Sequence, residues 1–180
     1  AKVVAGERIT PEEGLYLLKE APLLELGSLA QEVRYRHNPK PVVTFVIDTN
    51  LNYTNVCDAY CTFCAFYRTE KDDDAYTYTV EQVMEMVGQA AAKGVTTVLL
   101  QGGLNPKIPM EYYEELVRET RRRYPQVLPH YFSAPEIQKM SQVSEMPVSE
   151  VLLRLKEAGQ ETLPGGGSEI LSDQVKRRLS

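Results

Sequence analysis

The chain has 180 residues, of which 43% are hydrophobic, and this is enough apolar material for one packed core. Its 25 Asp and Glu residues outnumber its 20 Lys and Arg residues, so the net charge of −5 argues against a broad nucleic-acid-binding surface. The sequence shows no secretory signal and no apolar run long enough to span a membrane, so we expect no membrane partner and a cytoplasmic protein.

The opening part of the chain carries the signals of short helices. A capping threonine, a proline and two acids stand in order at residues 10–13, ahead of an apolar pattern with helical spacing. Pro22 and Gly27 are expected to divide this region into short helices. We therefore predict an N-terminal helical segment at residues 1–41, followed by a second part at residues 42–180.

The second part contains four runs that predict strands. Three of them are apolar and rich in β-branched or aromatic residues, at residues 42–47, 95–100 and 127–132. Pro129 weakens the third prediction because proline has no N–H group for a sheet. A shorter run at residues 161–163 predicts a fourth strand.

Helical patterns separate these predicted strands. One begins after Thr79 and ends at Gly94, one covers residues 110–124, one runs from Val148 to Gly159, and the last begins near Ser168. Alternation of strand and helix is typical of a parallel sheet with right-handed crossovers. The predicted fold is therefore α/β, with about four βα units preceded by short helices.

Several unusual residues follow the carboxyl ends of the predicted strands. They are a cysteine loop, Gly102 with Gly103, Ser133 with Glu136, and a glycine run at residues 165–167. Because βα barrels assemble their sites at this edge, we expect the four loops to face one site. Four strands do not close a barrel, and an open half exposes strand edges. We therefore expect another chain or segment to cover it.

The three cysteines of the chain, Cys57, Cys61 and Cys64, share one loop with the spacing C-x3-C-x2-C. Thiolates hold iron–sulfur clusters, and three of them bind three irons of a 4Fe-4S cluster and leave the fourth iron without a protein ligand. One alternative is a zinc-stabilised scaffold whose metal is completed by His37 or His130. Another is an electron-transfer module, which would normally supply four cysteines. Structural zinc sites usually contain paired C-x2-C motifs, and this loop does not, so the spacing favours the cluster with one open iron.

The cysteine spacing, Phe63 before the last cysteine, and Gly102 with Gly103 after a strand together resemble the radical S-adenosylmethionine enzymes. In that family S-adenosylmethionine chelates the open iron, and an electron from the cluster cleaves it to a 5′-deoxyadenosyl radical. The resemblance implies a partial TIM-type barrel of which this chain is the N-terminal half, to be completed by a missing C-terminal half or by a second chain. It also implies two cofactors, a 4Fe-4S cluster and S-adenosyl-L-methionine, and an electron donor of the flavodoxin or ferredoxin type.

The resemblance also suggests which residues contact the cosubstrate. Gly102 and Gly103 would let the backbone approach its amino acid end, because no Cβ stands in the way. Phe63 would pack against the adenine or shield the cluster, with ordinary loop packing as the alternative. Ser133 is a candidate for holding the cosubstrate and Glu169 for binding its ribose. Their alternatives are a helix cap and an acid in a first helical turn.

No catalytic residue is assigned, and His130 and Glu136 are the two candidates. His130 ends the third predicted strand and would face the cavity as a hydrogen-bond donor or proton acceptor, or else be a satisfied core residue. Glu136 would act on polar groups of the substrate, or else serve as the N3 residue of a capping box with Ser133.

Four segments narrow the resemblance to the futalosine-pathway enzymes of menaquinone biosynthesis, at residues 52–57, 63–68, 101–106 and 163–169. Tyr67 favours the enzymes that cyclise dehypoxanthine futalosine to cyclic dehypoxanthinyl futalosine, because the sister enzymes tend to carry serine there. Aminofutalosine synthase and the deazaflavin-cofactor synthases are the alternatives. A small-molecule nucleoside would then be the substrate. The resemblance covers only the first half of such an enzyme, so this chain alone is expected to be weakly active or inactive.

Overall fold

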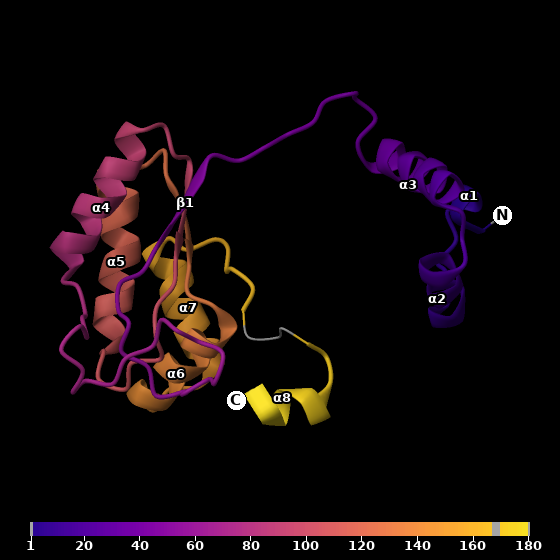
Figure 1. Cartoon of the computed structure of the whole chain (residues 1–180). Coiled ribbons are helices and arrows are strands. Elements are labelled where there is room, and N and C mark those ends of the chain that lie inside the picture. Colours follow the sequence, from indigo (N-terminus) through magenta and orange to yellow (C-terminus); the bar gives the residue numbers. More distant parts are fainter. Residues whose placement is uncertain (1, 167–169, 180) are drawn as a thin grey trace. The chain divides into compact units, whose positions relative to one another are not determined.

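The computed structural model describes residues 2–166 and 170–179, and the chain divides into two compact units between Phe45 and Val46. The first unit, drawn in indigo and purple in Figure 1, contains the helices α1 (Lys2–Ala5), α2 (Pro11–Lys19) and α3 (Leu23–His37). Pro22 is the N-cap of α3, as a helix boundary at this proline predicts. The predicted break at Gly27 is wrong, because α3 continues through it, and one interior glycine costs a helix only about 1 kcal/mol.

The second unit is built on a parallel sheet of three strands in the order β1-β2-β3. The strands are β1 (Asp48–Leu51), β2 (Thr97–Leu100) and β3 (Leu128–Tyr131). The predicted α/β class with parallel strands and intervening helices is therefore confirmed. The fourth predicted strand is reduced to a single bridge between Thr162 and His130.

The first strand does not lie where the apolar run predicts it. Residues 42–47 form no strand, and Val43 and Phe45 are 82% and 85% exposed. The register explains the shift, because Asp48 pairs with Thr97 at the first residue of β2. Earlier residues of the run have no β2 partner beside them, apart from the Ile47 carbonyl, which accepts the Thr96 N–H at 2.9 Å. The prediction of a strand at residues 42–47 is therefore wrong.

The described residues of the second unit also form five helices. They are α4 (Val80–Ala92), α5 (Met110–Arg123), α6 (Ala134–Ser144), α7 (Val148–Ala158) and α8 (Asp173–Leu179). The predicted helices at α4, α5 and α7 are confirmed. The last helix begins at Asp173, and its predicted start at Ser168 lies outside the described residues. No described helix is both long and apolar enough to cross a membrane.

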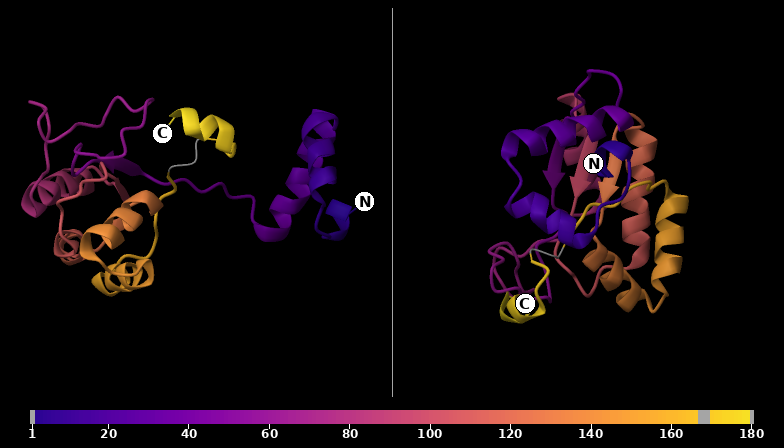
Figure 2. Two further views of the ribbon diagram at one scale, coloured as in Figure 1. Left: turned by 90° about the horizontal axis from the view of Figure 1, so that it is seen from below. Right: turned by 90° about the vertical axis from the view of Figure 1, so that its right-hand side faces the viewer.

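The core of the second unit lies between one face of the sheet and the helices α4 to α7 (Figures 1 and 2). Side chains alternate along the strands, so Val98, Leu100 and Tyr131 are buried toward the helices. On the opposite face, Asn50, Leu99 and His130 form one row across the register and are exposed or half-buried. The sheet therefore has one covered face and one open face.

Pro129 is accommodated because of its place in the hydrogen-bond pattern of β3. Leu128 N donates to Thr96 O, just before β2, at 2.8 Å, and Phe132 N donates to Leu100 O, at the end of β2, at 3.0 Å. In a parallel strand, successive N–H groups point to opposite sides. The missing N–H of Pro129 therefore belongs to the outer side of β3, where proline is tolerated.

Substitution of Leu116 by alanine should strongly destabilise the second unit. Leu116 is fully buried on α5, so truncation leaves a cavity and should lower the free energy of unfolding by about 2–5 kcal/mol. Chemical denaturation followed by circular dichroism measures this loss. Leu153→Ala on α7 is the matched control, because Leu153 is 53% exposed. Equal losses in the two variants would contradict the proposed core.

Candidate functional site

The loops at the carboxyl edge of the sheet lie against one another. The side-chain amide of Gln101, just after β2, donates to the Gly165 carbonyl at 3.4 Å. A Cβ on Gly166 would lie 2.8 Å from Ser133 Cβ, so the segment after α7 packs closely on the loop after β3. The structure thus brings the loop regions expected to form one site to one edge of the sheet.

The cysteine loop follows β1 and is held by backbone hydrogen bonds at several points. Cys57 N donates to Arg68 O at 3.0 Å, and Asp58 N donates to Leu104 O at 3.2 Å. Cys64 N donates to Cys61 O at 3.1 Å and closes a tight turn. None of the three cysteines forms a disulfide within the described part of the chain, and each is half-buried. The loop is therefore tied at both ends, with its sulfur atoms accessible to a cofactor.

Arg68 closes the far end of this loop. Its guanidinium donates to the carbonyls of Ala65 and Tyr67, at 3.1 and 2.9 Å, and to Asp74 Oδ1 at 2.7 Å. The hydrogen bond that Arg68 donates to Asp74, followed by the negative charge of that carboxylate, raises the pKa of the guanidinium. Arg68 therefore links the end of the cysteine loop to the loop that contains Asp74.

The donor set suits an iron–sulfur cluster. Each cysteine of such a cluster binds a different iron, whereas the ligands of one zinc ion must converge on a single atom. Within residues 2–166 and 170–179, no group of three or more His, Cys, Asp or Glu side chains is arranged to hold one metal ion. His130, a proposed fourth zinc ligand, uses Nδ1 to contact Thr162 Oγ1 at 2.8 Å. Three soft thiols on one short loop fit the cluster.

The glycine pair after β2 packs directly on the cysteine loop. A Cβ on Gly103 would stand 2.2 Å from the Val56 carbonyl oxygen and 2.9 Å from Cys57 Cβ. A Cβ on Gly102 would stand 2.7 Å from the Tyr53 ring. Glycine is therefore required at both positions by packing within the protein, in addition to any approach of a cosubstrate.

Both peptide N–H groups of the pair are used inside the protein. Gly103 N donates to Thr54 O at 2.9 Å, and Gly102 N donates to Glu136 Oε1 at 2.9 Å. The pair therefore cannot offer these donors to a cosubstrate without losing internal hydrogen bonds. Any backbone group that it offers a ligand's amino group is a carbonyl.

Glu136 lies at the centre of the edge and is only 2% exposed. Its Oε1 accepts hydrogen bonds from Tyr53 Oη at 2.8 Å and from Gly102 N, while its Oε2 accepts from Ser133 N at 2.7 Å and Ser133 Oγ at 2.6 Å. Burial raises the pKa of this carboxyl, and the hydrogen bonds oppose the rise. Burial, followed by the charge of Glu136, raises the pKa of Tyr53, so its hydroxyl stays protonated.

The other predicted residues have varied surroundings. Ser133 is buried as the N-cap of α6 and pairs with Glu136, as the capping-box alternative predicts. His130 lies on the open face of the sheet, which is the position that a cavity-facing residue requires. Phe63 is 52% exposed on the cysteine loop, and Glu169 lies outside the described residues. The cosubstrate roles of Phe63, Ser133 and Glu169 stay predictions.

Two contacts of this edge were not anticipated from the sequence. Tyr53 reaches Glu136 across 83 positions, and Lys139 Nζ lies 2.8 Å from Asp58 Oδ2 across 81 positions. Lys139 falls three residues after Glu136 on α6, a spacing that places both side chains on one helix face. That spacing is visible in the sequence, but the partners on distant loops are not.

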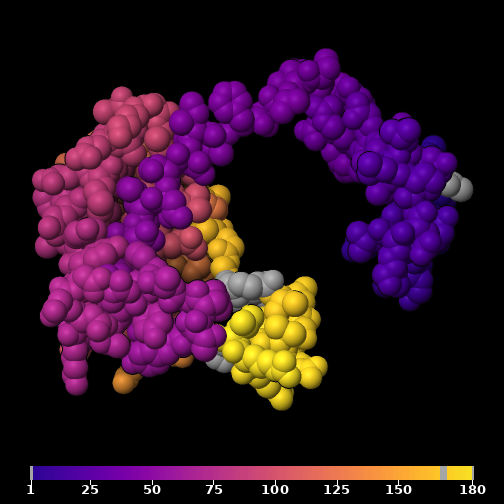
Figure 3. Space-filling view, viewed as in Figure 1, coloured from indigo at the N-terminus to yellow at the C-terminus, as the bar shows by residue number. Residues whose placement is uncertain are grey.

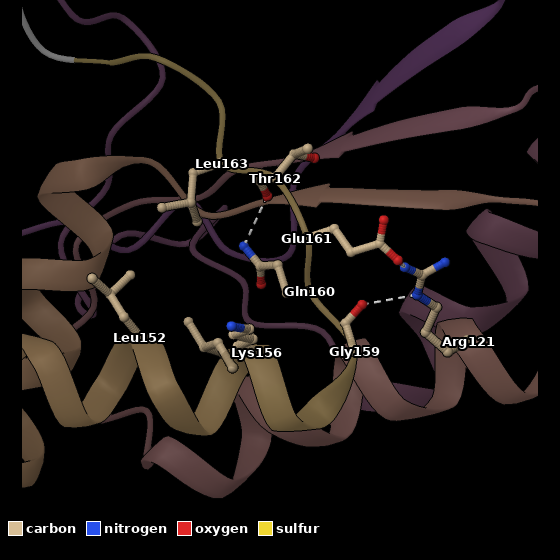
Figure 4. Close-up of a pocket in the computed structure, with 9 residues that line it drawn as sticks. Arg121, Leu152, Lys156, Gly159, Gln160, Glu161, Thr162 and Leu163 are labelled. Atoms are coloured by element: carbon tan, nitrogen blue, oxygen red, sulfur yellow. Dashed lines mark hydrogen bonds and ion pairs between the residues drawn. The ribbon is translucent and has the colours of Figure 1, made fainter.

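Two cavities flank the edge. A cavity of about 360 Å³ lies beside the cysteine loop, and its lining includes Cys57, Asp58 and Lys107. A second cavity of about 600 Å³ lies between α7 and the segment after it, away from the cysteines. Figure 4 shows Gln160 and the Arg121–Glu161 ion pair in this second cavity. The cavity beside the cysteines is the one that suits the predicted chemistry.

The C-terminal helix also lies against the cysteine loop. Thr62 donates from both its backbone N–H and its hydroxyl to the Leu179 carbonyl, at 2.8 and 2.9 Å. Figure 3 shows α8, in yellow, beside the magenta segment that carries the loop. The end of α8 therefore contacts the cysteine loop at Thr62.

A parallel sheet whose carboxyl edge presents a three-cysteine loop defines a βα-type enzyme with an iron–sulfur centre as its expected cofactor. The family model described as "Radical SAM superfamily" matches residues 51–180, so the chain belongs to this superfamily. The resemblance inferred from the cysteine and glycine motifs is thereby confirmed.

Two curated proteins with related sequences support the assignment to this superfamily. The chain is 39% identical over 179 residues to the cyclic dehypoxanthine futalosine synthase of Halalkalibacterium halodurans, covering 99% of this chain and 48% of that protein. It is 38% identical over 178 residues to the aminodeoxyfutalosine synthase of Streptomyces coelicolor, covering 99% and 46%.

Among solved structures, methylornithine synthase superposes with a TM-score of 0.68 at 20% identity, covering 99% of this chain and 49% of the other. This likeness supports the fold alone. The chain spans about half the length of the curated relatives it matches.

Substitution of Gly103 by alanine should disturb the cysteine loop. The new Cβ would overlap the Val56 carbonyl, so the loop must shift, at a cost of about 1–3 kcal/mol in the free energy of unfolding. We also expect less iron to be retained after anaerobic reconstitution. Thermal melts and iron analysis measure the two effects. Gly165→Ala is the matched control, because no atom lies within 4 Å of a Cβ there; a fully tolerated Gly103→Ala would contradict the packing described.

Proposed function

We propose that Cys57, Cys61 and Cys64 hold a 4Fe-4S cluster and that the adjoining glycine pair helps to bind S-adenosyl-L-methionine. The observation that carries this proposal is the three-thiol loop packed against Gly103 at the carboxyl edge of the sheet. When bound, the cluster and cosubstrate would supply reductive cleavage to an adenosyl radical. Family membership supports this chemistry.

The chain's own residues would hold and enclose these groups. The cysteine thiolates bind iron, and the bonds from Cys57 to Arg68 and from Asp58 to Leu104 fix the loop that carries them. The carbonyls of the glycine pair would be the acceptors for a cosubstrate amino group, because that group offers N–H donors. The Gly103 carbonyl already accepts one bond, from Asn105 N at 2.9 Å. A low-potential flavodoxin or ferredoxin would supply the electron.

For the reaction, we propose cyclisation of dehypoxanthine futalosine to cyclic dehypoxanthinyl futalosine in menaquinone biosynthesis. The similarity to a synthase of that name and the presence of Tyr67 support this choice. Aminofutalosine synthesis is the second candidate, because an enzyme of that type is nearly as similar. His130, on the open face of the sheet in one row with Asn50 and Leu99, is the candidate for contact with the nucleoside.

We further propose that a second half completes the site. Gln160 Oε1 is buried without a hydrogen-bond partner in the described part of the chain, although Gln160 Nε2 donates to Tyr131 O at 2.6 Å. Beside it, residues 161–163 make only a single bridge to β3. A further strand along this segment would offer N–H donors to that oxygen and would cover the edge.

Replacement of any one of the three cysteines by serine should remove most of the cluster. Serine is a harder and less acidic ligand, so the loop would keep only two thiolates for iron. Iron and sulfide analysis after anaerobic reconstitution measures the loss. Tyr60→Phe, which retains the ring in the same loop, is the control and should keep its iron. Full iron content in Cys57→Ser would contradict the ligand assignment.

Two proteins test the reaction: residues 1–180 alone, and the same residues fused to the C-terminal half of a relative. Each is incubated with dehypoxanthine futalosine, reductant and S-adenosylmethionine. We expect the extended protein to form cyclised product together with 5′-deoxyadenosine, and residues 1–180 alone to form little or none. 5′-Deoxyadenosine without cyclised product would favour the sister reaction. Robust turnover by residues 1–180 alone would contradict the need for a second half.

A further inference from the structure

The first turns of α6 contact both loops on which the proposed chemistry depends. Glu136 contacts the glycine loop through Gly102 N, and Lys139 contacts the cysteine loop through Asp58, which directly follows Cys57. Both side chains are largely buried: Glu136 is 2% exposed, and the Lys139 side chain is 16% exposed. One rigid helix therefore holds two loops that are about 45 residues apart in sequence, since they lie near residues 57 and 102.

The hydrogen bonds of Glu136 exceed what helix capping requires. The same N3 role is filled on α4 by Gln82, which is exposed and contacts only its own cap residue, Thr79, at 2.9 Å. It is filled on α2 by Glu13, whose Oε2 accepts from its own cap residue, Thr10, at 2.8 Å, while its Oε1 pairs with the exposed Lys2 at 2.7 Å. On α6 only Oε2 serves the cap, while Oε1 reaches the glycine loop and Tyr53. The second oxygen therefore joins α6 to the buried Tyr53 and to the glycine loop, whereas on α2 the second oxygen of Glu13 reaches only an exposed lysine.

The four donors also restrict what Glu136 can do. Each carboxylate oxygen already accepts two hydrogen bonds, which uses its lone pairs, so a substrate proton has no open acceptor site. A proton on either oxygen would displace one of these donors. The geometry thus favours a carboxylate that positions its neighbours over one that exchanges protons with a substrate.

We infer that Glu136 and Lys139 are positioning residues, and that α6 sets the place of the cosubstrate's glycine loop relative to the cluster's cysteine loop. Glu136 fixes the glycine loop, and Lys139 fixes the start of the cysteine loop. Tyr53 supports Glu136 by donating its hydroxyl and by packing its ring against Gly102. The inference rests on the proposed function for its consequence, but the two anchors are testable without any cofactor.

Hydrogen exchange of individual amides in the cofactor-free chain tests the two anchors separately. In Glu136→Gln, the Gly102 amide should exchange about tenfold faster, because it loses a charged acceptor, while Cys57 and Asp58 keep their rates. In Lys139→Met the pattern should reverse. Gln82→Ala and Lys93→Met are the matched controls for a lost cap residue and a lost lysine, and neither should change these amides.

The inference is overturned if Glu136→Gln leaves the Gly102 amide unchanged, or if all amides of both loops speed up together in each variant in step with a lower Tm. Tyr53→Phe gives a second, milder test, since it removes one donor to Glu136 and keeps the ring. It should accelerate Gly102 exchange in the same direction as Glu136→Gln.

The consequence for cofactors is read in the reconstituted protein. Glu136→Gln should keep its iron and bind S-adenosylmethionine about tenfold more weakly, whereas Lys139→Met should retain less iron. Loss of iron and cosubstrate binding in equal measure in both variants would contradict separate anchors. If the unmodified protein shows no cosubstrate binding at all, the proposed function fails, and the exchange rates still decide the role of α6.

Discussion

The close contact between Gly103 and the backbone of the cysteine loop is the constraint on which the site depends. A Cβ on Gly103 would lie only 2.2 Å from the Val56 carbonyl oxygen. The loops after β1 and β2 therefore pack so closely that only glycine fits at this position. This contact fixes the thiols beside the carboxyl edge of the sheet. The hydrogen bonds of Glu136 and Lys139 then hold the two loops to α6.

The rest of the second unit supplies a rigid base for this contact. Three short parallel strands are covered on one face by α4 to α7, and their buried side chains alternate with open-face residues such as Asn50 and His130. The cysteine loop, the glycine pair and α6 all begin where these strands end. In the proposed radical chemistry, the main task of this backbone is therefore to place the cysteine loop and the glycine pair beside each other.

Local signals in the sequence predicted much of this structure, and contacts between distant residues explain what they missed. Capping residues and apolar periodicity located α4, α5 and α7, and the cysteine spacing indicated the family. The run at 42–47 misled because apolar composition predicts burial, whereas strand limits depend on the partner's register. The sequence predicts Gly103 as a ligand contact, whereas its packing on Cys57 joins two residues that are far apart in the sequence. The Tyr53–Glu136 and Asp58–Lys139 pairs had no sequence signal for the same reason.

The central claim is that three cysteines hold a cluster with one iron open to S-adenosylmethionine. Electron paramagnetic resonance of the anaerobically reconstituted and reduced protein, recorded with and without S-adenosylmethionine, tests it most directly. A 4Fe-4S signal that changes on addition of the cosubstrate is the predicted result. An unchanged signal would indicate a cluster that only carries electrons, and a protein that binds zinc in place of iron would contradict the claim outright.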